Sequence, residues 1–298
     1  MVAFVALDDD TSFTAVTAGA ESNLATGVAA LGRASRWVSR LGDDPLGRLV
    51  VREVTDRGVD VNVEIDRSRP TGLMTKHIIG GTTDRRYYRS GSAASALGPA
   101  NVGSIDGATW VHVTGITPAL SASARSLVEA VADREGTGDA KVSFDVNLRP
   151  VLWTDLATAA DVLLSVARRC DVVFIGDDEA EALLGTSDAD ELAAAILERD
   201  DQELIVKRGA GPATLRTTTT SVTELAHHVD VVDPTGAGDA FAAGYLAGHC
   251  MGWEETARLR LGHAMAARVL GVTADVVPPF TDDELARLLE YRAADIRD

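Results

Sequence analysis

Lysine is scarce in this sequence, which has only three lysines among its 28 basic residues and a net charge of −17. Proteins that bind nucleic acid need a basic face to neutralise the phosphates. A chain this acidic is therefore a poor candidate for that class. Any phosphorylated ligand also poses a problem, because the local positive field must come from backbone dipoles, arginines or a bound cation.

Cysteine and long apolar runs are also in short supply. The two cysteines, Cys170 and Cys250, are far apart and lack C-x-x-C spacing, so the sequence indicates neither a disulfide framework nor a thiolate metal site. We expect both to be buried structural thiols. No apolar run reaches the roughly 18 residues needed to cross a bilayer, and the amino terminus lacks a secretory pattern. The expected location is the cytosol.

What the sequence does contain is a repeated alternation of short β-type runs and helical stretches, which predicts an α/β fold with a doubly wound parallel sheet. We expect a single domain over 1–298. Regions 2–18 and 59–90 depart from the alternation and are expected to form a small β-sheet lid. The predicted strands are 34–39, 108–114, 140–145, 171–175 and 203–207, and the predicted helices are 21–32, 44–57, 121–135, 155–169, 177–184, 188–199, 238–249, 254–270 and 282–292.

The strongest functional signal is DPTGAGDAF at residues 233–241, which follows the β-type run 229–232 and opens a helix rich in small residues. Gly236, Ala237 and Gly238 have little or no side chain, so their amides can approach a phosphate closely at the positive end of that helix. Asp239, in the first turn, would stand beside the phosphate and could accept a proton from an attacking hydroxyl.

A phosphate site is not the one role that this stretch could have. An ordinary strand-to-helix turn with an acidic cap accounts for a bare G-A-G-D about as well. A dinucleotide fingerprint is disfavoured, because Phe241 stands where its third glycine belongs. A P-loop is excluded, because its motif occurs nowhere in the chain.

The stretch resembles the signature D-[TP]-T-G-A-G-D-x-F of the ribokinase-like, or PfkB, sugar kinases. Two upstream segments match the family in the same order: GAESN at 19–23 resembles its sugar-binding G-G-x-x-x-N, and RLGDDPLG at 40–47 resembles its G-x-D-x-x-G. The resemblance implies a ribokinase-like fold, phosphorylation of a small sugar, Asp239 as the general base and residues 236–238 as the anion hole. It also implies sugar contacts from Gly19, Ala20 and Asn23.

On the nucleotide side the resemblance implies ATP as the donor, together with Mg²⁺. Residues 206–211 (VKRGAG) look like the family's nucleotide-binding strand and loop. Glu179 matches the Glu of the family's N-x-x-E motif, whose Asn is Gly176 here, so only an indirect role at the metal is expected. The expected ATP-binding residues are Asn147, Arg149, Lys207, Gly209, Gly211, Thr235, Gly236, Ala237, Gly238 and His263.

Two further segments narrow the acceptor. Residues 86–94 (RYYRSGSAA) and 145–153 (DVNLRPVLW) are similar to stretches of the 2-keto-3-deoxygluconate kinases within this family. A sugar acid carries a carboxylate, which arginine can hold with paired charge-assisted hydrogen bonds. The resemblance implies substrate contacts from Tyr87, Tyr88, Arg89, Asn147, Arg149 and Asp275, in addition to Asp239.

One departure from the family concerns the amino terminus. Family members usually begin with a core strand about ten residues before the stretch that corresponds to Met1-Val2-Ala3-Phe4. We expect that strand to be missing here, either because the start has been assigned downstream or because the protein lacks the strand. Three interpretations remain: a sugar-acid kinase, a kinase of fructose, ribose or another keto-deoxy acid, or a noncatalytic sugar-binding regulator. A homo-oligomer formed through the lid also fits the resemblance.

Overall fold

A computed structural model describes residues 1–6, 12–79, 82–105, 107–273 and 275–290. The chain divides into two compact units. Unit 1 contains residues 1–37, 41–89 and 225–298, and unit 2 contains residues 38–40 and 90–224. Among the described helices, none is both long and apolar enough to span a membrane.

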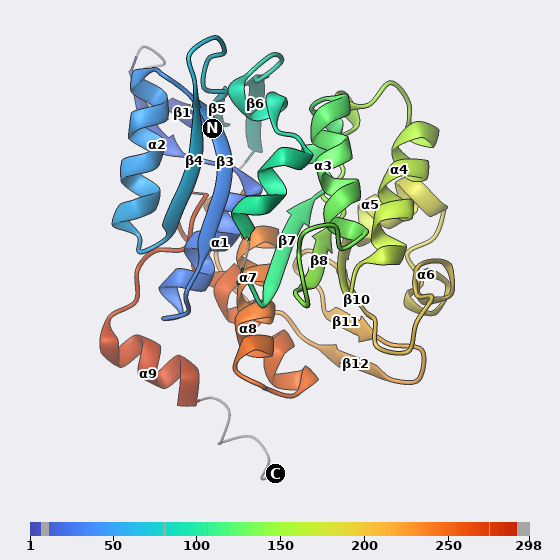
Figure 1. Ribbon diagram of the computed structural model, residues 1–298. Coiled ribbons are helices and arrows are strands. Elements are labelled where there is room, and N and C mark those ends of the chain that lie inside the picture. The colour runs from blue at the N-terminus through green and yellow to red at the C-terminus, as the bar shows by residue number, and fades with distance from the viewer. Residues whose placement is uncertain (7–11, 80–81, 106, 274, 291–298) are drawn as a thin grey trace. The chain divides into compact units, whose positions relative to one another are not determined.

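Unit 2 is built on a six-stranded sheet with the order β12-β11-β10-β9-β8-β7 (Figure 1). Strands β7 to β10 are parallel neighbours, whereas β11 and β12 are antiparallel additions at one edge. The strands are β7 (Trp110–Thr114), β8 (Lys141–Asp145), β9 (Val172–Gly176), β10 (Glu203–Lys207), β11 (Ala213–Arg216) and β12 (Ser221–Glu224). The crossover helices are α3 (Ala122–Ala132), α4 (Leu156–Arg169), α5 (Asp177–Leu184) and α6 (Ala189–Ile196), with short 3-10 turns at Ala93–Ala96, Pro99–Ile105, Thr117–Ala119 and Pro150–Leu152.

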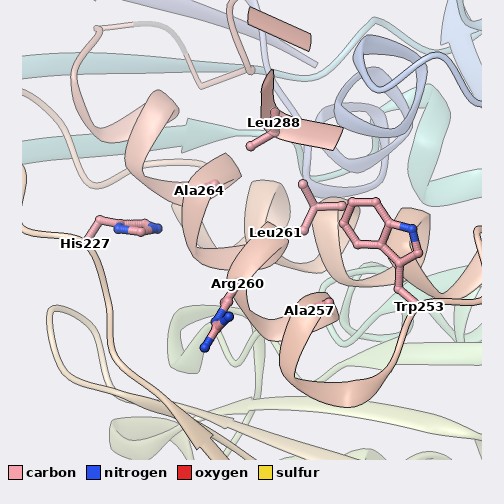
Figure 2. Close-up of a pocket in the computed structure, with 7 residues that line it drawn as sticks. All are labelled: His227, Trp253, Ala257, Arg260, Leu261, Ala264 and Leu288. Atoms are coloured by element: carbon pink, nitrogen blue, oxygen red, sulfur yellow. The ribbon is translucent and has the colours of Figure 1, made fainter. Parts of the chain in front are cut away.

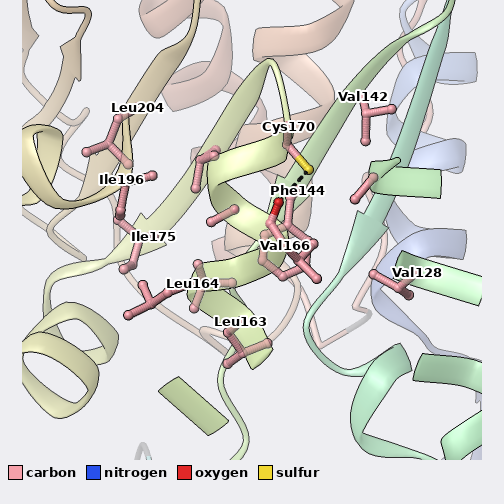
Figure 3. Packing of buried hydrophobic residues seen from close by; sticks show 14 of the residues in the cluster. Val128, Val142, Phe144, Leu163, Leu164, Val166, Cys170, Ile175, Ile196 and Leu204 are labelled. Carbon is pink, nitrogen blue, oxygen red and sulfur yellow. Dashed lines mark hydrogen bonds between the residues drawn. The ribbon is translucent and has the colours of Figure 1, made fainter. Parts of the chain in front are cut away.

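The core of unit 2 lies between these helices and one face of the sheet (Figure 3). Alternate strand residues such as Phe144 and Ile175 point into it, and Leu163 of α4 meets them with no exposed surface. Cys170 belongs to this cluster, where its thiol donates a hydrogen bond to the Val166 carbonyl at 3.3 Å. Burial raises the pKa of this thiol to about 12, so it is an unreactive packing residue, as expected.

Unit 1 contains a four-stranded sheet with the order β2-β1-β5-β6. Its strands are β1 (Val2–Ala6), β2 (Phe13–Thr17), β5 (Leu73–Ile79) and β6 (Thr82–Tyr88). These strands fall in the two regions expected to form the small sheet. A strand within the second region, β4 (Asp60–Asp66), pairs instead with β3 (Arg36–Gly42). The role of the four-stranded sheet as a lid stays a prediction.

The helices of unit 1 pack closely because small residues line their contacts. They are α1 (Ala20–Ala30), α2 (Pro45–Asp56), α7 (Ala237–Cys250), α8 (Glu255–Leu270) and α9 (Asp282–Glu290). A Cβ added at Gly27 of α1 would lie 2.7 Å from the Cβ of Ala243 in α7. A Cβ added at Gly244 of α7 would lie 2.6 Å from the Leu261 carbonyl oxygen in α8. Glycine at these points allows the three helices to pack closely against one another.

Most of the predicted elements are confirmed, with boundaries that shift by a few residues. Two predictions are wrong. Residues 229–232, expected as a strand before the phosphate motif, form no strand, although the Val232 amide bonds to the Leu270 carbonyl at 2.8 Å. Cys250, expected to be buried, is exposed near the end of α7, because the last turn of that helix faces solvent.

Candidate active site

The turn before α7 presents backbone amides at a helix amino terminus. Gly236 is the N-cap residue, with a left-handed φ of 83° that favours glycine. A Cβ at this position would lie 2.1 Å from the carbonyl oxygen of Asp275, so only glycine fits this close approach. The first amides of a helix have no intrahelical acceptor and lie at its positive end. This geometry suits an anion.

Asp239 lies in the first turn of the same helix and is held by a residue of the first sugar motif. The side-chain amide of Asn23 donates to Asp239 Oδ2 at 2.9 Å, across 216 positions of sequence. Asn23 is placed by the start of α1, where its backbone amide donates to the Gly19 carbonyl at 2.8 Å. The buried Oδ1 of Asn23 accepts no hydrogen bond from the part of the chain that is described. Buried polar atoms are normally hydrogen-bonded, so this oxygen is suited to accept a hydrogen bond from a bound ligand.

Gly19 and Ala20 form the backbone entry to this helix. Gly19 has a φ of 139°, and a Cβ there would lie 3.0 Å from the Ser22 hydroxyl oxygen, which donates to the Gly19 carbonyl at 2.9 Å. Ala20 is the first residue of α1 and is buried. These two expected sugar contacts thus sit next to Asn23, within one helical turn.

The second upstream motif forms a tightly hydrogen-bonded corner. Asp44 caps α2 by accepting from the Gly47 amide at 2.7 Å, and its other oxygen accepts from the Thr71 amide at 2.8 Å. Burial alone would raise the pKa of Asp44, but these backbone hydrogen bonds lower it overall. A Cβ on Gly42 would lie 2.4 Å from Asp44 Oδ2, which explains the glycine. The carboxylate of Asp44 therefore supports this corner of the chain.

Tyr87, Tyr88 and Arg89, at the end of β6, are expected to contact a sugar acid, and their side chains point to two different faces. Tyr87 and Arg89 share one face of the strand, and the Arg89 guanidinium carbon lies 4.4 Å from the centre of the Tyr87 ring. Arg89 is buried, whereas Tyr88 points to the opposite face and is 60% exposed. Side chains alternate between the faces of a strand, so Tyr88 points away from the face that Tyr87 and Arg89 share.

A buried ion-pair network underlies the phosphate turn. Lys76 of β5, whose side chain has no exposed surface, pairs with Asp233 and lies 2.6 Å from Asp275 Oδ1. Its ammonium also donates to the Thr273 carbonyl at 3.2 Å. The expected sugar contact Asp275 is therefore bound to a lysine and is 2% exposed.

The other oxygen of Asp233 organises the turn itself. It accepts from the Thr235 amide at 3.0 Å and the Thr235 hydroxyl at 2.7 Å, and Arg85 of β6 donates to that hydroxyl oxygen at 2.6 Å. Burial would raise the pKa of Asp233, but the hydrogen bonds from Lys76 and Thr235 lower it overall. For Asp275, burial outweighs the ammonium and the pKa is raised. Thr235, expected to bind ATP, is thus fixed by two charged side chains.

In unit 2, the expected nucleotide residues gather at the carboxyl edge of the parallel strands. Lys207, the last residue of β10, donates to Asp145 Oδ2 at 2.7 Å, and Asp145 is the last residue of β8. Ligands of open α/β sheets bind at this edge. Gly209, with a φ of 52°, and Gly211, whose amide donates to the Arg208 carbonyl at 2.7 Å, form the turn into β11.

Glu179 joins the loops that follow β8 and β9. Its two oxygens accept from the Leu148 amide at 2.8 Å and the Gly176 amide at 2.9 Å. Burial and the nearby Asp145 raise its pKa, although Lys207 opposes this. Because both oxygens are engaged, the geometry fits an indirect role at a metal. No group of three potential metal-ligating side chains occurs among the residues that the structure describes.

Asn147 and Arg149 follow β8 in the same loop. Asn147 has a left-handed φ of 40° and is buried, and its amide donates to Asp145 Oδ1 at 3.3 Å. The Arg149 guanidinium lies 3.9 Å from Glu179 Oε1 and is partly exposed. An exposed guanidinium beside this edge of the sheet remains accessible to a negatively charged ligand.

His263 lies on the inner side of α8. Its ring packs edge-on against Phe241 of α7, with 5.1 Å between the ring centres, and it is buried. Other residues of α8 border a cavity of about 250 Å³. Figure 2 shows the cavity lining, with His227 and Trp253 on opposite sides of the view. The other lining residues are Leu288 of α9 and four residues of α8: Ala257, Arg260, Leu261 and Ala264.

The comparison with known families is decisive. A model of the pfkB family carbohydrate kinases matches residues 4–278. The chain belongs to the pfkB carbohydrate kinase family. Members use ATP as the phosphate donor, and the ribokinase-like fold and carbohydrate kinase class expected from the sequence are confirmed.

Individual relatives of this kinase agree with the family. It is 39% identical over 266 residues to the 2-dehydro-3-deoxygluconokinase of Thermoproteus tenax, covering 87% of this chain and 80% of the relative. It is 34% identical over 289 residues to the 2-dehydro-3-deoxygluconokinase of Bacillus subtilis, covering 95% and 89%. The crystal structure of a PfkB protein from Polaromonas sp. JS666 superimposes with a TM-score of 0.84 at 30% identity, covering 99% and 97%.

Two residues of this kinase contact predicted site residues without having been assigned a role from the sequence: Lys76 in unit 1 and Asp145 in unit 2. In the sequence, Asp145 is only the start of a motif, and Lys76 is only one of three lysines. A signal for Lys76 exists, because Met74 and Lys76 share the buried face of β5. A lysine on the apolar side of an alternating strand requires a buried partner.

Proposed function

We propose that this kinase transfers the γ-phosphate of ATP to the C6 hydroxyl of 2-keto-3-deoxygluconate, also called 2-dehydro-3-deoxygluconate, yielding the 6-phosphate and ADP. The observation that carries the proposal is the 2.9 Å hydrogen bond between Asn23 and Asp239. It joins the sugar motif to the phosphate motif within unit 1.

Asp239 is the proposed general base. As the oxygen of the acceptor hydroxyl attacks phosphorus, its proton passes to the carboxylate. The bond from phosphorus to the bridging oxygen breaks, and ADP leaves with the electron pair. The hydrogen bond from Asn23 fixes the carboxylate in one orientation, which is the positioning that phosphoryl transfer demands of a protein.

The amides of Gly236, Ala237 and Gly238 are the proposed anion hole. They stand at the amino end of α7, which favours the negative charge that develops on the transferred group. Thr235 is proposed to contact the same phosphate from the preceding position. Bound Mg²⁺ would offset further phosphate charge, and Glu179 is proposed to act on it through other groups.

The carboxylate of the sugar acid is the feature that separates this acceptor from fructose. We propose that Arg89 and Arg149 bind it and that Tyr87 contributes ring surface and a hydroxyl. The two relatives named as 2-dehydro-3-deoxygluconokinases support this choice. Tyr88 has the weakest claim, because its side chain is 60% exposed on the other face of β6.

The nucleotide is proposed to bind at the carboxyl edge of the unit 2 sheet. Lys207, Gly209 and Gly211 come from the end of β10 and the turn after it, with Asn147 from the loop after β8. His263 is proposed to act near the adenine. Association of subunits through the four-stranded sheet and a cytosolic location stay predictions.

The test measures ADP release on 2-keto-3-deoxygluconate and on fructose with the same enzyme preparation. We expect a higher kcat/KM for the acid. Equal or better use of fructose would defeat the acid assignment, and sugar binding without ADP release would favour the regulatory interpretation. Asp239→Asn is expected to lower kcat by about 10²–10⁴ while sugar binding persists, since that is the usual contribution of a general base.

A further inference from the structure

A fully buried lysine lies close to the proposed anion hole, a place where the sequence motif itself supplies no cation. The side chains of Lys76, Asp233 and Asp275 are 0%, 1% and 2% exposed. Their formal charges sum to one negative. Burying charges is costly unless they are paired and fully hydrogen-bonded. The arrangement therefore calls for a reason beyond packing.

Asp233 and Asp275 contact the proposed phosphate-binding turn at its two ends. Asp233 opens the turn and bonds to Thr235 through Oδ1, leaving Oδ2 for the ammonium. Asp275 lies against the other side, where its carbonyl oxygen would be 2.1 Å from a Cβ on Gly236. Lys76 therefore links Asp233, the first residue of the turn, to the segment around Asp275 that Gly236 contacts.

The ammonium also changes the electrostatics of the turn. Without it, two buried carboxylates would remain beside amides that must bind a phosphate. Arg85 lies 3.7 Å from Asp233 and is partly exposed, so it offsets only part of that charge. Negative carboxylates next to a desolvated site repel a bound phosphate strongly.

We propose that Lys76 is a positioning residue for phosphoryl transfer: its ammonium holds the turn at residues 233–236 in place and offsets the charge of the two carboxylates next to the proposed anion hole. The inference rests on the proposed function only in so far as the turn binds the transferred phosphate. It holds for a sugar acid or a neutral sugar alike.

The experiment compares Lys76→Ala with the parent and with Lys141→Ala. Lys141 lies exposed on β8, away from the proposed site, and is the matched lysine control. We expect Lys76→Ala to lower kcat by about 100-fold, the scale of a lost transition-state donor, with KM for the sugar changed less than about threefold. Lys141→Ala is expected to match the parent.

Chemical rescue separates positioning from a merely structural role. The atoms removed by Lys76→Ala correspond to n-propylammonium, which is expected to restore kcat of that variant at least about tenfold and to leave Lys141→Ala unchanged. The double variant Lys76→Met, Asp275→Asn removes one charge of each sign. It is expected to be more active than Lys76→Met alone.

Two results would overturn the proposal. One is a folded Lys76→Ala enzyme with kcat within about threefold of the parent. The other is loss of folding and activity together, with no rescue by the amine and no gain in the double variant. Should the parent release ADP with neither sugar, the proposed function fails. Calorimetric ATP affinity of the parent and Lys76→Ala then decides the point, because weaker binding in the variant supports the positioning role and equal binding refutes it.

Discussion

Replacing Gly236 with alanine adds one methyl group to the proposed phosphate-binding turn, at the point where the turn approaches the backbone of Asp275. The left-handed φ of 83° costs a non-glycine residue about 1–2 kcal/mol. The added Cβ would also lie 2.1 Å from a backbone oxygen of Asp275, which no side-chain rotation can relieve. The turn must therefore shift by a substantial fraction of an ångström.

Gly58 is a matched control for the backbone strain. It follows α2, has the same φ of 83°, and a Cβ there would meet nothing within 4 Å. Gly58→Ala is expected to lower the free energy of unfolding by about 1–2 kcal/mol, the strain of a left-handed alanine, and to leave kcat unchanged. Gly236→Ala carries the same strain together with the steric conflict.

The assays are denaturant unfolding and steady-state ADP release. We expect Gly236→Ala to be less stable than Gly58→Ala and to lose about 10²–10³ in kcat, the range seen when a transition-state donor is misplaced. Equal kcat values for the two variants would refute the reasoning, because a displaced turn would then be irrelevant to phosphate transfer.

Two further predictions concern the supports of the site. Asp44→Ala should cost about 1–2 kcal/mol as a lost helix cap in neutral solution. The pKa of Asp44 is lowered in the folded state. The difference in unfolding free energy between the parent and Asp44→Ala should therefore persist above pH about 4, the ordinary pKa of an aspartate, and shrink as the pH falls below it. Unfolding experiments at several pH values measure this. Glu179→Ala deprives two backbone amides of their acceptor and should cost roughly 2–4 kcal/mol, whereas no loss in unfolding experiments would contradict that role.

The elements of unit 2 are predictable from the sequence because their signals are local. The runs that form β7 to β10 are short and apolar, and the helices between them have apolar faces and capping residues such as Asp155, which accepts from the Thr158 amide at 2.7 Å. The prediction for residues 229–232 fails for a related reason. A β-type pattern shows that residues suit a strand, but not that a neighbouring strand is available to pair with them.

The candidate site is predictable where backbone chemistry dictates the residue. Gly236 is required by both its φ and its close contact, so a motif search finds it. The partners of charged groups are a different matter. Lys76 and Asp275 are 199 positions apart, and no local pattern encodes a pairing over that separation.

The charges around the proposed phosphate turn suggest how so acidic a protein could bind a phosphate there. Three carboxylates stand at the turn, those of Asp233, Asp239 and Asp275. Lys76 pairs with the first and the last, and Arg85 reinforces the pairing at Asp233. The remaining carboxylate is that of Asp239, the proposed base. It accepts a hydrogen bond from Asn23 and lies in the first turn of α7, at the positive end of that helix. Lys76 and Arg85 thus offset the charges of Asp233 and Asp275, and the amino end of α7 remains available to a phosphate ligand.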